Sequence, residues 1–421
     1  MAKYIVEQSG PLFGEVEISG AKNAALPILA ATVLTEGICE INDVPRLRDI
    51  DVMCRILRSL GAKVDEDWDT HTIKVDGSGI SVSEVPYDLV KLMRASIFVM
   101  GPLLARLGKA SIAQPGGCSI GDRPIDLHAK GLRNLGAKIL MSDDLVNASV
   151  DTLKGALVYL DFPSVGATEN IMMAATLAEG STTIENAAEE PEIVDLASFL
   201  NKMGARIKGA GTDTIRIEGV KALHGTRHAV IPDRIETGTF MVAAAITRGN
   251  VLIKNSVPDH VRPVIAKLIE CGAVVNDELE GLRVRGDVNR LVATDIKTLP
   301  YPGFPTDMQA PFMALLTTVS GTSTVIETVF ENRFMHAGEL SRLGANIRVN
   351  GRTAMVPGDK RPLVGAPVMS TDLRGGAALV LAGLVAKGKT EVSEIYHIER
   401  GYEHFVEKLS GLGAKITRVE D

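Results

Sequence analysis

Leu57-Arg-Ser-Leu-Gly-Ala-Lys-Val64 decides the fold, because its pattern recurs five more times along the chain. Each copy has a leucine four residues before Gly-Ala and a valine or isoleucine three residues after the glycine. The leucine lies on an apolar helix face, the glycine ends the helix in a left-handed conformation, and the β-branched residue begins a strand. Two Gly-Ala pairs would mean little, whereas six in register indicate a repeated unit. The six glycines are Gly61, Gly136, Gly204, Gly272, Gly344 and Gly413.

A second glycine precedes each of these by about 25 residues and predicts the rest of the unit. An alanine-rich run of helical length comes before it, as at 167–179 and 237–248, and a β-branched residue follows four positions later. These second glycines are Gly37, Gly108, Gly180, Gly249, Gly321 and Gly388. Each unit therefore reads helix, glycine, strand, loop, helix, Gly-Ala, strand.

Six α/β units divide naturally into three plus three, with a joint near Ala229–Pro232. We expect one domain over residues 22–229 and a second over 1–21 plus 230–421. The alternation of Tyr4 with Val6 and of Val16 with Ile18 predicts two N-terminal strands, which would complete the sheet of the last unit.

Composition narrows the class of protein. The chain has 421 residues, 45% of them apolar and 23% charged, which is typical of a globular protein. A net charge of −7 argues against general binding of nucleic acid or an anionic membrane. Four cysteines are too few for a disulfide framework and suit a reducing cytoplasm. Apolar runs of about ten residues are too short to span a membrane, and no export signal is visible.

The start of each unit's first helix carries the clearest functional signal. Lys22, Arg94 and Arg374 stand at equivalent helix starts, where the helix dipole favours anions and disfavours cations by about 0.3–1 kcal/mol each. Their recurrence predicts a cleft that binds anions. The alternative is that they are solvated or paired with acids such as Asp49 or Asp372.

A second signal is the loop Gln114-Pro-Gly-Gly-Cys-Ser-Ile-Gly-Asp-Arg-Pro124, which has three glycines and two prolines. It carries Cys118, with Arg123 five residues later, and a thiol beside an arginine is a candidate nucleophile or acid. Cys39, Cys54 and Cys271 fall in predicted strand or helix segments and are interpreted as buried hydrophobic residues. The sequence contains no phosphate-binding loop, dinucleotide fingerprint or zinc-ligand spacing, which discounts the classes of protein that these motifs mark.

Over nearly its whole length the chain resembles the enolpyruvyl transferases. The matching runs are Ser19-Gly-Ala-Lys-Asn23, Pro115-Gly-Gly-Cys-Ser-Ile-Gly121, Arg123-Pro-Ile-Asp-Leu-His128, Ser164-Val-Gly-Ala-Thr168, Pro232-Asp-Arg-Ile-Glu-Thr-Gly238, Phe304-Pro-Thr-Asp-Met-Gln309, Phe330-Glu-Asn-Arg-Phe-Met-His336 and Asp372-Leu-Arg374. The resemblance implies two inside-out α/β domains of three units each, with an active site in the interdomain cleft. It also implies transfer of enolpyruvate from phosphoenolpyruvate to the 3′-hydroxyl of UDP-N-acetylglucosamine, with release of phosphate and without a cofactor.

The resemblance also implies a set of site residues. Cys118, Asp307, Lys22 and Arg400 would be catalytic, and fosfomycin would alkylate Cys118. Phosphoenolpyruvate would contact Lys22, Asn23, Arg123, Arg374 and Arg400. The sugar nucleotide would contact Arg94, Arg123, Pro124, Ile125, Asp126, Leu127, Ser164, Val165, Asp307 and Val329. Phe162 departs from the family pattern, since some members carry lysine there.

Three alternatives stay open at this point. The same fold acts on shikimate 3-phosphate in a related enzyme, although the glycine-flanked Cys118 disfavours that acceptor. A sugar-nucleotide sensor without catalysis would have the same binding residues. Asp307 in Pro-Thr-Asp-Met also suits an ordinary helix cap, worth about 1 kcal/mol.

Overall fold

The computed structural model describes residues 2–114, 120, 125–142, 144–358 and 362–420. Cys118, Arg123 and Pro124 lie outside the described residues. The chain divides into two compact units. We call Gly20–Gly117 with Arg123–Ile231 the Lys22 unit, and Met1–Ser19, Cys118–Asp122 and Pro232–Asp421 the Asp307 unit. No helix in the described ranges is long and apolar enough to cross a membrane.

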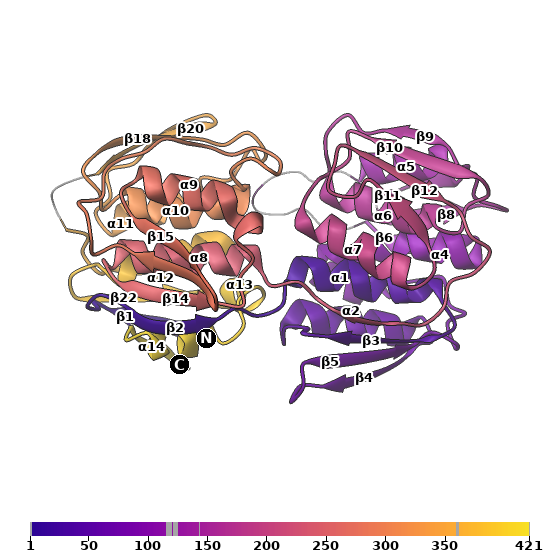
Figure 1. Ribbon diagram of the computed structural model, residues 1–421, viewed down its shortest axis with the longest axis horizontal. Helices are drawn as coiled ribbons and strands as arrows, with labels where there is room; N and C mark the ends of the chain where they lie inside the picture. The colour runs from indigo at the N-terminus through magenta and orange to yellow at the C-terminus, as the bar shows by residue number, and fades with distance from the viewer. Residues whose placement is uncertain (1, 115–119, 121–124, 143, 359–361, 421) are drawn as a thin grey trace. The chain divides into compact units, whose positions relative to one another are not determined.

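The Lys22 unit contains three α/β repeats in chain order (Figure 1). The first comprises α1 (Lys22–Ala31), η1 (Thr32–Leu34), β3 (Ile38–Asn42), α2 (Arg48–Ser59), β4 (Lys63–Asp67) and β5 (Thr72–Asp76). The second comprises α3 (Tyr87–Leu92), η2 (Arg94–Val99), α4 (Met100–Leu107), β6 (Lys109–Ala113), α5 (Asp126–Asn134), β7 (Lys138–Met141) and β8 (Leu145–Ser149). The third comprises β9 (Leu157–Tyr159), α6 (Val165–Ala175), β10 (Ser181–Glu185), α7 (Pro191–Lys202), β11 (Arg206–Lys208), β12 (Thr214–Glu218) and β13 (Arg227–Ala229).

The Asp307 unit repeats the plan three more times and includes the N-terminal strands β1 (Lys3–Glu7) and β2 (Phe13–Glu17). Its first repeat comprises α8 (Arg234–Ile246), β14 (Asn250–Lys254), η3 (Pro258–Val261), α9 (Arg262–Glu270), β15 (Val274–Glu278) and β16 (Gly281–Arg285). The next comprises β17 (Ile296–Lys297), η4 (Thr306–Met308), α10 (Gln309–Leu316), β18 (Gly321–Ile326), α11 (Met335–Arg342), β19 (Arg348–Asn350) and β20 (Thr353–Gly358). The last comprises β21 (Pro367–Met369), α12 (Leu373–Gly383), β22 (Lys389–Ser393), α13 (Tyr396–Glu399), α14 (Phe405–Gly411) and β23 (Lys415–Val419).

Each repeat forms its own small sheet. In the Lys22 unit the strand orders are β13-β3-β5-β4, β6-β8-β7 and β11-β12-β10-β9, and in the Asp307 unit they are β15-β16-β14-β2, β17-β18-β20-β19 and β21-β22-β1-β23. In five repeats the strand that follows the buried helix pairs antiparallel with a later strand of the same repeat: β3 with β5, β6 with β8, β10 with β12, β14 with β16 and β18 with β20. Five of the sheets add a parallel edge strand. Strand β1 pairs antiparallel with both β22 and β23 and completes the sheet of the sixth repeat, as predicted. For β2 the prediction was wrong, because β2 pairs parallel with β14 in the sheet of the fourth repeat.

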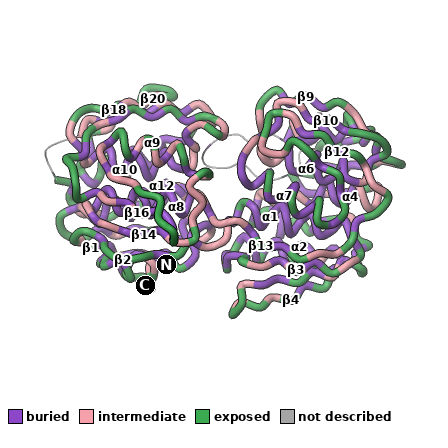
Figure 2. The backbone as a smooth tube through the Cα atoms, viewed as in Figure 1, coloured by how far each residue is buried: buried purple, intermediate pink, exposed green. Residues whose placement is uncertain are grey.

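The helices lie inside each unit and the sheets outside, as the resemblance implied (Figure 2). Helix α10 is buried along its whole length, and α12 and α8 are buried at nearly every position. Since a helix that is apolar on all sides needs protein around it, alanine-rich sequences form the centre here. Sheets have one face against these helices and one face in solvent, which explains the alternating burial of strands such as β12.

The repeat glycines take the predicted conformation. All six Gly-Ala glycines have a φ between 95° and 108°, a left-handed region that side chains rarely adopt. Gly37 and Gly249, of the second set, serve another purpose, because a Cβ there would lie 2.4 Å from the Gly225 nitrogen and 2.2 Å from the Leu12 oxygen. At these two positions glycine permits close approach of two backbones.

Two of the predicted helix starts differ in detail. Arg94 and Asp307 stand in 3₁₀ turns that lead into α4 and α10, and not in the α-helices themselves. Pro102 and Pro311 are each the third residue of the α-helix that follows. Proline has no N–H to donate back to residues 98 and 307, so the preceding turn lacks its α-helical bond and tightens.

Candidate active site

Acidic residues occupy the helix starts of the Asp307 unit. Asp233 caps α8 by accepting from the backbone nitrogens of Ile235 and Glu236 at 2.7 and 3.0 Å. Asp372 caps α12 by accepting from those of Arg374 and Gly375 at 3.0 and 3.1 Å. Asp307 lies in η4, and η4 contacts α8 while α12 contacts both α8 and α10. The repeat therefore gathers three carboxylates at one end of this unit's helices.

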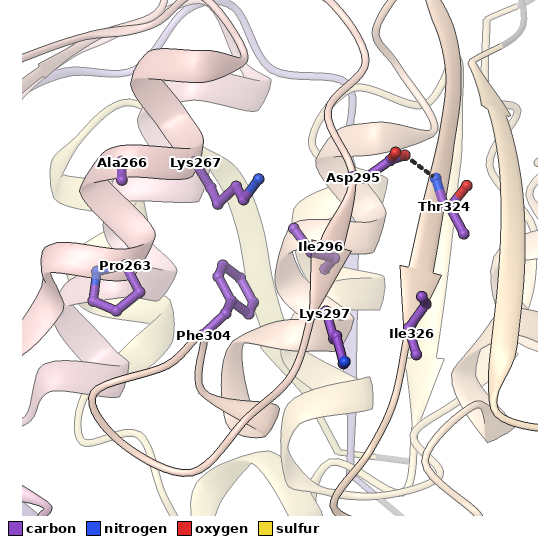
Figure 3. Close-up of a pocket in the computed structure, with 9 residues that line it drawn as sticks. All are labelled: Pro263, Ala266, Lys267, Asp295, Ile296, Lys297, Phe304, Thr324 and Ile326. Carbon is purple, nitrogen blue, oxygen red and sulfur yellow. Dashed lines mark hydrogen bonds between the residues drawn. The ribbon is translucent and has the colours of Figure 1, made fainter.

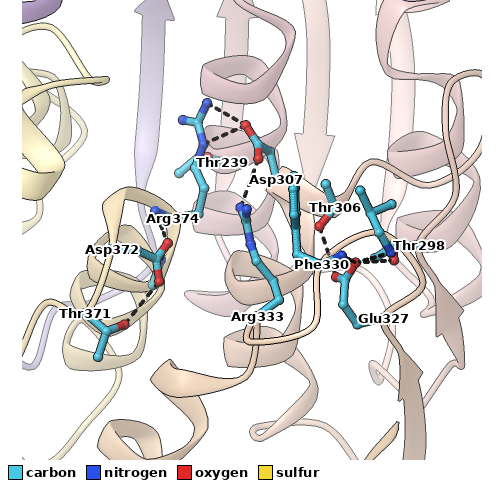
Figure 4. A network of polar contacts seen from close by, with 12 residues as sticks. Thr239, Thr298, Thr306, Asp307, Glu327, Phe330, Arg333, Thr371, Asp372 and Arg374 are labelled. Carbon is cyan, nitrogen blue, oxygen red and sulfur yellow. Dashed lines mark hydrogen bonds and ion pairs between the residues drawn. The ribbon is translucent and has the colours of Figure 1, made fainter. Parts of the chain in front are cut away.

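The carboxylate of Asp307 is held between two arginines (Figure 4). Arg333 donates from Nη2 to Oδ1 at 2.9 Å, and Arg374 donates to Oδ2 from Nη2 at 3.0 Å and from Nε at 3.2 Å. The arginine side chains are 2% and 4% exposed, and that of Asp307 is 27% exposed. The N-cap residues of η4 and α10 are Pro305 and Met308, so Asp307 stands at neither N-cap position. Two buried arginines therefore fix the position of the Asp307 carboxylate, which remains partly exposed to solvent.

Arg374 has one more donor group besides the two nitrogens that bond to Asp307. Its Nη1 is buried and has no hydrogen-bond partner among the described residues. Burial would lower the pKa of Arg374, but the neighbouring Tyr402, Asp307 and Asp233 raise it above its ordinary value, so the guanidinium stays charged. The guanidinium carbon lies 5.2 Å from the centre of the Tyr402 ring, a cation–π contact. An unused buried N–H of a charged arginine suits an anionic ligand.

The other predicted residues of this unit lie on nearby segments. Arg400 follows α13 directly and is half-buried. Val329 is half-buried, and its backbone nitrogen donates to Glu327 Oε1 at 2.9 Å. Burial lowers the pKa of the His397 ring, and the nearby charge of Arg400 lowers it further.

In the Lys22 unit the helix starts carry cations or neutral groups. Lys22 is the first residue of α1, 8% exposed, and its Nζ lies 3.3 Å from Asp49 Oδ2. The pairing with Asp49 that the sequence left open is therefore present. Asn23, the next residue, is exposed. The N-cap position of α1 is Ala21, which offers no side-chain acceptor to the helix.

Arg94 begins η2, which contacts both α1 and α6. It is half-buried and lies close enough to His128 to act on its charge, although burial is the main reason why the pKa of His128 falls to about 4. A Cβ on Gly166 would lie 3.2 Å from the His128 ring and 3.2 Å from the Phe98 ring, so the first turn of α6 packs against both. The starts of α1, η2 and α6 thus adjoin one another.

The remaining predicted contacts of this unit surround these helix starts. Ser164 caps α6 by accepting from the Ala167 nitrogen at 3.4 Å, and Val165 is the first residue of that helix. Ile125 is buried just before α5, Asp126 is exposed in its first turn, and Leu127 is half-buried. Phe162 is 42% exposed, two residues before the Ser164 cap.

The three described cysteines confirm the reading of buried hydrophobic residues. Burial raises the pKa of the Cys54 thiol to about 12 and of the Cys271 thiol to about 11, and it also raises that of Cys39. Such thiols are poor nucleophiles at neutral pH. Cys118 lies outside the described residues, so its role stays a prediction.

A pocket of about 450 Å³ lies elsewhere in the Asp307 unit (Figure 3). Pro263, Lys267, Lys297, Phe304 and Ile326 are among the residues that line it, and none of the predicted site residues does. Three of the lining residues lie one or two positions before a polar residue in the sequence: Lys297 before Thr298, Ile326 before Glu327, and Phe304 before Thr306. Among the described residues, no cluster of histidine, cysteine or acidic side chains could hold a metal ion.

Sequence reasoning missed two polar residues of the Asp307 unit. Arg333 is part of a quoted motif but received no role, and it proves to be one of the two arginines on Asp307. Glu327 was not singled out, although it is buried and accepts four hydrogen bonds. The available signal was a glutamate directly after the apolar pair Val325-Ile326 at the end of a strand.

The chain matches known proteins over its full length. Residues 6–409 match the family model of EPSP synthase (3-phosphoshikimate 1-carboxyvinyltransferase). The chain is 62% identical, over 99% of both sequences, to UDP-N-acetylglucosamine 1-carboxyvinyltransferase 1 of Caldanaerobacter subterraneus subsp. tengcongensis. It is 60% identical, over the whole of both, to UDP-N-acetylglucosamine 1-carboxyvinyltransferase 2 of Carboxydothermus hydrogenoformans.

Solved structures show the same architecture. The enolpyruvyl transferase NikO from Streptomyces tendae superposes with a TM-score of 0.89 at 25% identity, covering 99% of each chain. EPSP synthase from Acinetobacter baumannii superposes with a TM-score of 0.75 at 20% identity, covering all of each chain, which shows the fold alone. Six inside-out α/β repeats, with an acid held between two buried arginines, thus define a class of transferase. The chain belongs to the EPSP synthase family of enolpyruvyl transferases, which confirms the resemblance.

Proposed function

We propose that this enzyme transfers the enolpyruvyl group of phosphoenolpyruvate to the 3′-hydroxyl of UDP-N-acetylglucosamine and releases phosphate. The observation that carries the proposal is the 62% identity, over 99% of both chains, with a relative named for that acceptor. The reaction would be the first committed step of peptidoglycan biosynthesis, in the cytoplasm.

The charges of the helix starts support anionic substrates. Lys22 and Arg94 begin helices whose N-terminal N–H groups favour anions. We assign phosphoenolpyruvate to Lys22, Asn23, Arg123, Arg374 and Arg400. The unused Nη1 of Arg374 supports its part, because a guanidinium binds carboxylate or phosphate oxygens through paired N–H groups. The sugar nucleotide is assigned to Arg94, residues 123–127, Ser164, Val165, Asp307 and Val329.

Asp307 is the proposed base. The reaction is an addition followed by an elimination: the methylene carbon of the enol takes up a proton, and the sugar oxygen attacks the adjacent carbon. The tetrahedral ketal then loses phosphate together with a proton of its new methyl group, which forms the enol double bond again. Asp307 would accept the proton of the attacking hydroxyl or orient that hydroxyl. Its fixed position between Arg333 and Arg374 supports this role, since general bases need a defined geometry.

Cys118 is the proposed acid and the site of alkylation by fosfomycin. In a glycine-rich loop with Arg123 near in sequence, its thiolate would be favoured over the thiol. The mass of the intact protein after fosfomycin treatment, followed by peptide mapping, tests this. We expect one adduct, on Cys118. An adduct on Cys39, Cys54 or Cys271 would contradict the assignment, and burial of these three thiols makes them natural internal controls.

The acceptor is tested by measuring phosphate release from phosphoenolpyruvate with each of two acceptors. We expect release with UDP-N-acetylglucosamine and none with shikimate 3-phosphate. The reverse result would assign the related activity. Tight binding of the sugar nucleotide without phosphate release would instead indicate a sensor, and both outcomes would overturn the proposal.

A further inference from the structure

We propose that Glu327 is a positioning residue that holds Asp307 and Val329 in one arrangement through four hydrogen bonds. The inference deepens the proposed function and rests on it for the roles of Asp307 and Val329. Figure 4 shows Glu327 with its threonine partners on one side of Phe330 and the Asp307–Arg333 pair on the other.

The carboxylate of Glu327 is enclosed by donors. The residue is 1% exposed. Its Oε1 accepts from Thr298 Oγ1 at 2.8 Å and from the Val329 nitrogen at 2.9 Å, and also from the Phe330 nitrogen at 3.2 Å. Its Oε2 accepts from Thr306 Oγ1 at 3.0 Å. The Glu327 carboxylate is therefore the acceptor in all four of these hydrogen bonds.

The four donors belong to three separate segments of one repeat. Thr298 follows β17, Thr306 is the first residue of η4, and Val329 and Phe330 follow β18. Thr306 directly precedes Asp307, and Val329 is a predicted sugar-nucleotide contact. Glu327 thus connects the segment that carries the proposed base with a segment assigned to the acceptor.

The backbone around Glu327 is fixed independently of its side chain. The Glu327 nitrogen donates to the Arg352 oxygen at 2.9 Å, and Arg352 Nη1 donates to the Thr328 oxygen at 2.9 Å. The Thr328 nitrogen donates to Thr298 Oγ1, also at 2.9 Å. A carboxylate on such a support can set the position of η4, because a buried side chain with fixed partners has little freedom to adjust.

Thr306→Val separates positioning from folding. Valine keeps the shape of threonine but removes the hydroxyl that joins η4 to Glu327. We expect kcat to fall about tenfold, the scale of one hydrogen bond to a charged group, with the KM for UDP-N-acetylglucosamine changed less than kcat. Thr318→Val is the matched control: Thr318 is also half-buried, and its Oγ1 donates to the Leu315 oxygen at 2.7 Å, in the same unit.

Two variants of Glu327 test whether its contacts or its charge matter. Glu327→Gln can keep all four contacts, since its amide oxygen can replace Oε1 while its nitrogen donates to Thr306, whose hydroxyl turns to accept. We expect its kcat to stay within about threefold of wild type, because hydrogen bonds are exchanged and not lost. Glu327→Ala removes every contact, so we expect a raised KM for UDP-N-acetylglucosamine and faster amide hydrogen exchange at Val329 and Phe330.

The outcomes decide the inference. A wild-type kcat in folded Thr306→Val, or equal losses in Glu327→Gln and Glu327→Ala, would overturn it. Wild-type exchange at Val329 and Phe330 in Glu327→Ala would do the same. If the wild-type chain releases no phosphate with this acceptor, the proposed function fails separately, and hydrogen exchange in the Glu327 variants, which needs no substrate, still decides whether Glu327 orders these segments.

Discussion

The two units use the same repeat position in opposite ways. In the Asp307 unit, Asp233 and Asp372 cap the helices, and Asp307 sits in the turn that begins the third. In the Lys22 unit, the equivalent turns begin with Lys22 and Arg94. Their N-cap residues are Ala21 and Met93, whose side chains have no oxygen that could accept a hydrogen bond from the helix. Only α6 there has a polar cap, Ser164.

This difference assigns different chemistry to the two helix ends. Carboxylates at the caps neutralise the helix dipoles of the Asp307 unit, and buried arginines then fix its remaining acid. In the Lys22 unit α1 and η2 begin with cations, of which Lys22 pairs with Asp49. Under the proposed function these helix starts would receive an external anion. The two units therefore share a repeat but differ at its helix starts, with a positioned acid in one unit and the proposed anion site in the other.

Asp307→Asn gives the strongest test of the acid half of the comparison. Asparagine keeps the size of the side chain but accepts protons poorly, so we expect kcat to fall by about 10²–10⁴, the usual contribution of a general base. Steady-state kinetics with both substrates would measure this, together with thermal unfolding to show that the variant is folded.

A matched control for Asp307→Asn is Asp295→Asn in the same unit. Asp295 accepts from the Thr324 nitrogen at 2.6 Å and lies beside the pocket of Figure 3. Its variant should keep wild-type turnover. Substantial turnover by folded Asp307→Asn would mean that the acid of this unit does not take part in the chemistry.

Arg374→Lys also tests the positioned acid of the Asp307 unit, with a smaller expected effect. Lysine keeps the charge but cannot reproduce two N–H groups on Asp307 Oδ2 while leaving a third for a ligand. We expect kcat/KM for phosphoenolpyruvate to fall about 10- to 100-fold, from loss of one or two hydrogen bonds between charged groups.

The control for Arg374→Lys is Arg418→Lys, at a partly exposed arginine that pairs with Glu399 and Glu420. Near-normal kinetics for Arg374→Lys would show that Arg374 contributes only general positive charge. Kinetics as poor in the Arg418 variant would point to an effect on the fold and not on the site.

Much of the fold could be predicted from the sequence, because the same pattern of helices and strands occurs in six repeats. The glycine of each Gly-Ala pair ends a helix because it adopts a left-handed conformation. Alanine-rich runs indicate which helices lie at the centre of a unit. The partners of Arg333 and Glu327 could not be predicted from the sequence, because they are set by the packing of distant segments. Arg374 and Asp307, for example, are 67 residues apart. No local pattern states which carboxylate a buried arginine meets.

Arg94→Ala tests the anion half of the comparison. We expect the Kd for UDP-N-acetylglucosamine, measured by calorimetry, to rise about tenfold, the effect of losing one charged hydrogen bond. The pKa of His128 offers a second readout, because Arg94 lowers it after burial does. It should rise in the variant from about 4, while burial keeps it below 6.5. Unchanged affinity would remove Arg94 from the anion site.

Glu169→Gln asks whether an acid cancels the positive end of the Lys22 unit. Glu169 is buried in α6, and neither carboxyl oxygen has a hydrogen-bond partner among the described residues. Burial, reinforced by Glu192 and Glu190, raises its pKa well above 4.5. The group is therefore neutral at pH values where an unfolded chain ionises it, and it leaves the charge of the helix start intact.

The sign of the pH effect follows from the raised pKa. The stabilising contribution is complete below about pH 4.5 and declines as the pH rises toward the folded pKa, since the unfolded state then loses a proton that the folded state keeps. Relative to Glu169→Gln, wild type should lose about 1.4 kcal/mol of unfolding free energy per pH unit in that range. Denaturant unfolding at pH 5, 6 and 7 measures this, with Glu218→Gln on the exposed face of β12 as control. Parallel pH profiles for wild type and Glu169→Gln would mean that Glu169 is ionised in the folded protein, and the Lys22 unit would then hold an ionised acid in addition to Asp49.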